Sequence, residues 1–189
     1  CSGASGDVLW EGVLVTVADW LASWLASKGI KHCFGIIGAG NISIFDAIAR
    51  LGKTQIICTH HEQAAAMSAT YYWRTCGRLA PVLATTGAGS SNTLTGVLAA
   101  WMDSIPLLVI SGNEPTRFIE RDEENRVIGV QGYHSALVAQ GMAKDGVSSR
   151  KPEFVEDDLE RLYDLALTPR FGPVWVDLPR DVQTMKAPM

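Results

Sequence analysis

The sequence predicts an α/β fold with a single open, parallel sheet of about six strands and helices on both faces. Short, almost continuously apolar segments alternate with segments whose apolar residues recur at helical spacing. Strands that are apolar on both sides are typical of parallel sheets covered by two layers of helices. Glycine-rich turns at residues 38–40 and 87–89 follow two of the apolar segments. Such turns mark the carboxyl ends of strands, where open α/β sheets bind their ligands.

Composition narrows the possible function classes. The 189 residues are 47% hydrophobic and 19% charged, which is ordinary for one globular domain. The formal net charge of −4 argues against nucleic-acid or membrane partners. No apolar run approaches the roughly 18 residues of a membrane-spanning helix, and no signal peptide is recognisable. We therefore expect a cytoplasmic protein with reduced thiols, in which Cys33 and Cys58 act as small buried hydrophobes.

Residues 1–12 are expected to be a leader or cloning remnant, and residues 13–189 to form the domain. In the first half of that domain, helices are predicted at 13–28, 42–49, 62–74 and 90–101. Strands are predicted at 30–37, 54–59, 81–86 and 106–111.

The second half of the domain is less regular. After Ser111 the pattern lapses for about twenty residues, in a long loop of the kind that often carries function. A helix is predicted at 133–140, a short strand at 143–147, a proline-initiated helix at 152–167 and a last strand at 173–178.

Glu62 is the main candidate for chemistry. It begins a helix of small residues directly after an apolar strand. A carboxylate in the first helical turn can simply complement the helix dipole. Apolar surroundings could also desolvate it, so that it shares a proton with a bound heterocycle. The adjacent glycine turns would let a ligand approach backbone N–H groups.

Two other classes of protein stay open on the residues alone. The pattern Gly38-x-Gly40-x-x-Ser43 nearly matches a dinucleotide-binding turn, and Glu62 lies about twenty residues downstream, where that motif has its acidic residue. A dinucleotide-binding oxidoreductase module is therefore one alternative. A non-catalytic regulatory subunit with the same fold is another.

Four segments, in order and spacing, resemble the pyrimidine-binding domain of thiamine-diphosphate enzymes, nearest to the acetolactate synthase branch. They are residues 61–69, 86–96, 102–108 and 172–183. The resemblance implies thiamine diphosphate as the cofactor. It also implies that Mg²⁺ and the diphosphate are bound by a partner domain, because the Gly-Asp-Gly motif of that domain is absent here and no metal ligands are expected in this chain.

The resemblance also implies roles for individual residues. Glu62 would hydrogen-bond the aminopyrimidine and activate the cofactor. Gln131 falls where the family has a glutamine near the substrate, and His134 and His61 are further candidates to face it, with a surface position as the alternative. The residues expected at the cofactor or at a subunit contact, unless they merely form strand-to-helix turns, are Gly38, Gly87, Ala88, Gly89 and Asn92.

Taken as a whole, the resemblance implies one part of a 2-oxo acid decarboxylase or carboligase. A diphosphate-binding domain or subunit would complete it in a homo- or hetero-oligomer, and we expect this partner to cover apolar surface on helices 62–74 and 90–101. The small subunit of a sulfopyruvate- or phosphonopyruvate-type decarboxylase is an alternative. Ala88 stands where acetolactate synthases commonly have proline, and Tyr71 where they have glycine, so the substrates stay open.

Overall fold

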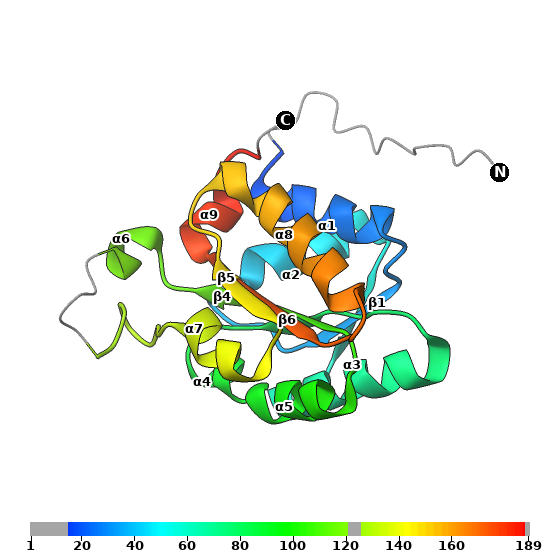
Figure 1. Cartoon of the computed structure of the whole chain (residues 1–189). Coiled ribbons are helices and arrows are strands. Elements are labelled where there is room, and N and C mark those ends of the chain that lie inside the picture. The colour runs from blue at the N-terminus through cyan, green and yellow to red at the C-terminus, as the bar shows by residue number, and fades with distance from the viewer. Residues whose placement is uncertain (1–14, 121–125, 188–189) are drawn as a thin grey trace.

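A computed structural model describes residues 15–120 and 126–187; the expected leader, residues 1–12, lies outside them. Six parallel strands form one open sheet in the order β2-β1-β3-β4-β6-β5 (Figure 1). The predicted α/β fold class is confirmed. The strands are His32–Gly35 (β1), Gln55–Cys58 (β2), Val82–Ala84 (β3), Leu107–Asn113 (β4), Asp145–Ser148 (β5) and Pro173–Pro179 (β6).

Helices cover both faces of the sheet, as predicted (Figure 1). One face carries α1 (Val17–Ser27), α2 (Ile42–Leu51), α8 (Pro152–Leu167) and α9 (Arg180–Thr184). The other face carries α3 (Glu62–Cys76), α4 (Ala88–Ser91), α5 (Leu94–Asp103) and α7 (Ser135–Ala139). The remaining helices are α6 (Thr116–Ile119), beside α9, and a 3-10 turn at Gln140–Met142. None of the helices in the described ranges is long and apolar enough to cross a membrane.

The predicted helix at residues 90–101 is divided into α4 and α5. At the junction, the amide and the hydroxyl of Thr93 both donate to the carbonyl oxygen of Ser90, which tightens the turn. Hydroxyl side chains compete with the regular helical ladder in this way. The division leaves Asn92 at the end of α4.

The short helices α6 and α9 are not predicted from the sequence, because four or five residues are too few to display helical periodicity. Each follows a proline, Pro115 or Pro179. The Asp181 carboxylate joins them by accepting hydrogen bonds from the amide and the hydroxyl of Thr116. They are thus stabilised by a contact between distant segments.

Apolar side chains fill both sides of the sheet. On the α1 side, Leu25 and Ile44 are fully buried, and on the α3 side so are Ala66 and Trp175. A side chain at Gly96 would place its Cβ 2.4 Å from the Cβ of Ala66. The glycine therefore lets α5 pack closely on α3.

The two strand cysteines differ in burial. Cys33, in β1 inside the sheet, is buried as expected, and burial raises the pKa of its thiol to about 12. The expectation of a buried Cys58 is wrong, because β2 is an edge strand and Cys58 is exposed at its end. Edge position depends on strand order, which local apolarity does not reveal.

The strand order reverses between β1 and β3. The chain passes from β1 outward to β2 and then returns to form β3 on the other side of β1. The turn after β1 leads to α2 on one face, whereas the turn after β3 leads to α4 on the opposite face (Figure 1). Open α/β sheets bind ligands at such switch points. Both glycine-rich turns lie there, as predicted from the sequence.

Candidate functional site

Glu62 lies in the first turn of α3, just after the edge strand β2, and is only 9% exposed. Its Oε2 accepts a hydrogen bond from Asn92 Nδ2 at 3.0 Å. No residue in the described ranges donates a hydrogen bond to its Oε1. The site therefore holds one carboxylate oxygen in place and leaves the other available as an acceptor.

The turn after β3 approaches Glu62 closely. A Cβ at Gly89 would lie 2.6 Å from Thr85 Cγ2 and 3.2 Å from Glu62 Oε1. Gly87 has a positive φ of 71°, a backbone conformation that suits glycine. Ala88, between them, is exposed. Glycines here allow the turn, the carboxylate and Asn92 to come together.

The turn after β1 packs against the same segment. A Cβ at Gly38 would lie 2.5 Å from Thr85 Oγ1, and one at Gly40 would lie 2.1 Å from Thr86 Oγ1. The Gly40 amide also donates to Thr85 Oγ1 at 3.0 Å. Packing within the protein thus accounts for both glycines. Contact between Gly38 and a cofactor stays a prediction.

Gln131 reaches the site on a tight hairpin. Ile128 and Gly132 exchange both backbone hydrogen bonds at its base. At its tip, the amides of Val130 and Gln131 donate to Glu114 Oε1, each at 3.3 Å. A Cβ at position 87 would lie 2.6 Å from the Gln131 carbonyl oxygen, so this hairpin packs against the second glycine turn.

The two candidate histidines have different neighbours. His61 is the N-cap of α3: its Nδ1 accepts a hydrogen bond from the Gln63 amide at 3.2 Å, which requires that nitrogen to be unprotonated. His134 lines a cavity whose lining does not include Glu62 or the glycine turns. No hydrogen bond joins either histidine to the Glu62 carboxylate within the described ranges, and a substrate contact for either stays a prediction. Within the described ranges, no group of three or more acidic, His or Cys side chains could hold a metal ion.

A buried polar network links α4 to the ends of β4 and β6, and it was not predicted from the sequence. Ser90 Oγ donates to Tyr133 Oη at 3.0 Å, and Asn113 Nδ2 donates both to the Tyr133 carbonyl and to the Asp177 carboxylate. Asp177 also accepts from Ser111 Oγ at 2.6 Å. It is fully buried, and burial raises its pKa to about 6 despite these hydrogen bonds. An acidic residue inside an apolar strand is the sequence signal that could have revealed it.

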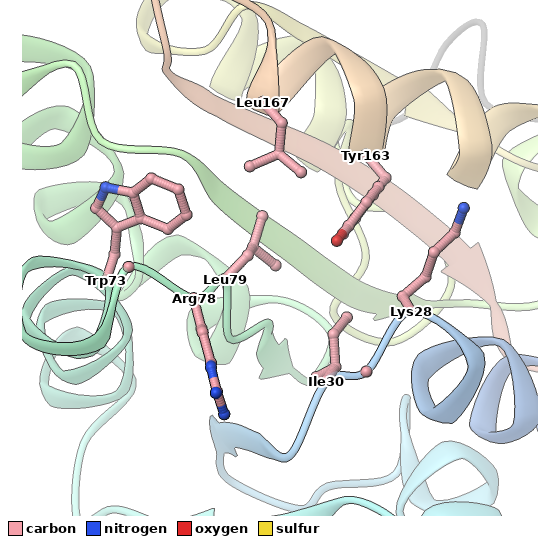
Figure 2. Close-up of a pocket in the computed structure, with 9 residues that line it drawn as sticks. Lys28, Ile30, Trp73, Arg78, Leu79, Tyr163 and Leu167 are labelled. Carbon is pink, nitrogen blue, oxygen red and sulfur yellow. The ribbon is translucent and has the colours of Figure 1, made fainter. Parts of the chain in front are cut away.

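A cavity of about 310 Å³ lies at the other end of the sheet, where β1 and β3 begin (Figure 2). The side chains of Leu79, Tyr163 and Leu167 converge on it (Figure 2). The Lys28 ammonium forms an ion pair with Glu160 at 2.5 Å. Because this cavity is at the amino ends of the strands, it is not part of the Glu62 site.

The chain matches the family model for the thiamine pyrophosphate enzyme, N-terminal TPP binding domain, over residues 15–146. It is 34% identical over 171 residues to the acetolactate synthase large subunit of Buchnera aphidicola subsp. Schizaphis graminum. It is 34% identical over 166 residues to the corresponding subunit of Haemophilus influenzae, and 34% identical over 174 residues to the isozyme 3 large subunit of Escherichia coli. These alignments cover 89%, 87% and 89% of the chain, which spans 28% of the length of each relative.

Proposed function

Because the chain belongs to the family of thiamine pyrophosphate enzyme N-terminal domains, we propose that it supplies the pyrimidine-binding half of an active site for 2-oxo acids. The observation that carries this proposal is the half-paired carboxylate of Glu62. Asn92 fixes Oε2, and Oε1 is left able to accept a hydrogen bond from the N–H of a protonated ring nitrogen. The named activity of the relatives, acetolactate synthase, supports a decarboxylation or carboligation reaction.

The residues around Glu62 fit an aminopyrimidine. A side chain at Gly89 would begin 3.2 Å from Oε1, so glycine keeps this position from covering the oxygen, and the low exposure of Glu62 strengthens any hydrogen bond that it accepts. A carboxylate that accepts a hydrogen bond from a ring nitrogen stabilises the form of the ring that carries the proton there. Thiamine diphosphate supplies, when bound, a carbon nucleophile and an electron sink for cleaving the bond beside the carbonyl of a 2-oxo acid.

Further residues of the chain would orient and enclose the reactants. The Gly87–Gly89 turn would border the pyrimidine, and the hairpin that carries Gln131 would lie over that turn on the substrate side. Both are rigidly attached: α4 follows the turn directly, and Glu114 holds the hairpin tip. Rigid placement of such groups reduces the entropic cost of the reaction.

A second domain or subunit would complete the site by binding the diphosphate and Mg²⁺ through oxygen ligands. The surface offered to it has exposed apolar side chains on α3 and α5, where Tyr71 is 64%, Leu98 43% and Met102 68% exposed. Adjoining apolar groups of this kind favour association. We therefore propose that the active protein is an oligomer, with this face at the contact.

The proposal is tested by Glu62→Gln, with Glu153→Gln as the matched control. Both residues occupy the first turn of a helix, α3 or α8, but Glu153 is exposed and far from the glycine turns. The readout is exchange of the thiazolium C2 proton with solvent in the native assembly, followed by NMR after acid quench. We expect Glu62→Gln to slow exchange by about 10²–10⁴-fold, and the control to leave it unchanged. Unchanged exchange in a Glu62→Gln assembly that still binds the cofactor would contradict the assignment.

A further inference from the structure

The strand order reverses a second time, at the opposite edge of the sheet. β6 is inserted between β4 and β5. The connection from β4 to β5 includes α7 on one face, and the connection from β5 back to β6 is α8 on the other (Figure 1). The carboxyl ends of these strands therefore form a second switch point, the kind of place where open α/β sheets bind ligands.

A cavity of about 230 Å³ occupies this second switch point. Asn113 ends β4, Ser148 ends β5, and Asp177 lies near the end of β6; all three line the cavity, together with Arg150. At about 30 Å³ for each water in the liquid, the space suits a molecule of roughly six to eight non-hydrogen atoms. The apolar wall comes from Ile119 and Leu137.

The polar groups of the cavity define its chemistry. Ser148 Oγ is buried and has no hydrogen-bond partner in the described part of the chain. Burying a hydroxyl without a partner is costly, which indicates that a ligand or water bonds it. Arg150 is exposed, and within the described ranges its guanidinium forms no salt bridge, although its charge acts through space on Asp177. A guanidinium at the mouth of a cavity suits a carboxylate, which it can bind through two parallel hydrogen bonds.

Asp177 restricts the ligand further. One of its oxygens accepts a hydrogen bond from Ser111 and the other from Asn113, and Ser135, which also lines the cavity, lowers its pKa as a third hydrogen-bonding side chain. Two carboxylate oxygens offer about four acceptor sites, so Asp177 keeps capacity for one further donor. The Asp177 carboxylate can accept a hydrogen bond from a neutral donor such as a hydroxyl, whereas its negative charge repels a multiply charged anion such as phosphate. The cavity thus combines a cationic group, Arg150, with groups that accept hydrogen bonds.

We propose that this cavity binds a small monocarboxylate that carries a hydroxyl group. Arg150 pairs with the carboxylate, and Ser148 with Asp177 bonds the hydroxyl. The inference does not depend on thiamine diphosphate or on Glu62. It gives the chain a second binding site, at the edge of the sheet opposite β2.

Three related probes test the proposal on the 189-residue chain. L-Lactate has both groups, acetate lacks the hydroxyl, and L-lactamide lacks the charge. We expect saturable binding of L-lactate, seen by NMR as shifts of the amides at 113, 148 and 150. Acetate should bind about tenfold more weakly for want of one hydrogen bond, and L-lactamide should not bind measurably.

Variants of the chain identify the groups responsible. Arg150→Gln should weaken L-lactate binding at least about tenfold, because a charge-assisted pair is lost. Arg161→Gln is the matched control, since Arg161 pairs with Asp145 outside the cavity. Ser148→Ala should weaken L-lactate binding but leave acetate binding unchanged, and removal of an unpaired hydroxyl does not threaten the fold.

Three outcomes would overturn the inference: equal affinity for L-lactamide and L-lactate, unchanged affinity in Arg150→Gln, or no saturable shifts at the three cavity amides. Glu62→Gln distinguishes this site from the proposed cofactor site. If that variant binds L-lactate normally, the cavity acts independently; if it abolishes binding, the probe occupies the Glu62 site and the inference fails.

Discussion

The side-chain amide of Asn92 donates a hydrogen bond to the carboxylate of Glu62 at 3.0 Å, across 30 residues of sequence. The contact joins the end of α4 to the first turn of α3. Because Glu62 is nearly buried, an oxygen without a partner there would be costly. Asn92 thus stabilises the carboxylate and fixes the direction in which its second oxygen points.

Asn92→Ala should lower the free energy of unfolding by about 1–2 kcal/mol, since it leaves Glu62 Oε2 without its donor. Ser91→Ala is the control: Ser91 is the neighbouring residue on α4, and its hydroxyl bonds only the Ala88 carbonyl. Urea unfolding followed by circular dichroism measures both. Equal free energies of unfolding for the two variants would show that the hydrogen bond to Glu62 makes no net contribution to stability.

The contact of Glu62 with Asn92 illustrates what the sequence can predict. Both residues were expected near the cofactor, and the strands that precede their helices were located from their apolar character alone. Local periodicity places a residue at the end of a strand, and parallel pairing then brings neighbouring strand ends together. The parallel sheet of six strands therefore follows from short-range patterns, whereas the expectation that Asn92 lies at a cofactor came from the family resemblance.

Contacts set by long-range packing could not be predicted in this way. The hydrogen bond from the Gln131 amide to Glu114 forms only because the irregular segment after β4 folds back on itself, and its conformation has no regular sequence pattern. The burial of Asp177 and the exposure of Cys58 depend on strand order, which fixes the central and edge strands. The spacing of apolar residues along the sequence therefore predicts neither the position of the hairpin nor the burial of these two side chains.

The burial of Asp177 predicts a pH dependence of stability. Burial raises the pKa of this carboxyl from 3.8 to about 6, while hydrogen bonds from Ser111 and Asn113 and the charge of Arg150 oppose the rise. The folded chain therefore retains a proton that the unfolded chain has already released. The stabilising contribution is complete below about pH 4 and is lost as the pH rises through about 6.

Asp177→Asn isolates this effect. The free energy of unfolding of the native chain, minus that of the variant, should fall by about 2 kcal/mol between pH 4 and pH 7, following the two pKa values. The other groups that face Asp177, which include Arg150, Tyr133 and His134, are present in both proteins. Urea titrations across this range measure the difference, and a difference independent of pH would refute the raised pKa.

Glu114 is predicted to hold the Gln131 hairpin through its carboxylate oxygen. Glu114→Ala should raise amide hydrogen exchange at Val130 and Gln131 by about tenfold, because each amide loses its acceptor. Glu114→Gln keeps an acceptor oxygen and should preserve most of the protection. If the amides of Val130 and Gln131 exchange equally fast in Glu114→Gln and in Glu114→Ala, the side-chain oxygen of residue 114 does not hold the hairpin.

The exposed apolar face of α3 and α5 should be the contact with the partner domain. Leu98 is 43% exposed on α5, one helical turn before the exposed Trp101 and Met102, and α5 packs on α3, which carries the exposed Tyr71. Leu98→Glu would bury a charge if a partner covers this face, and should weaken the assembly by more than about tenfold. Leu137→Glu is the control, because Leu137 is 63% exposed on α7, which is neither of the two helices of the proposed contact.

Native mass spectrometry of protein purified from its own source, with thiamine diphosphate and Mg²⁺ present, reports the assembly and its cofactor together. We expect an oligomer that retains the cofactor mass, that Leu98→Glu dissociates and that Leu137→Glu leaves intact. In the proposed site, Glu62 would supply only one contact to the cofactor and the partner would bind the diphosphate. Dissociation should therefore also release the cofactor. An assembly that Leu98→Glu leaves intact would exclude this face as the contact, and a monomer that binds NAD instead would support the dinucleotide alternative.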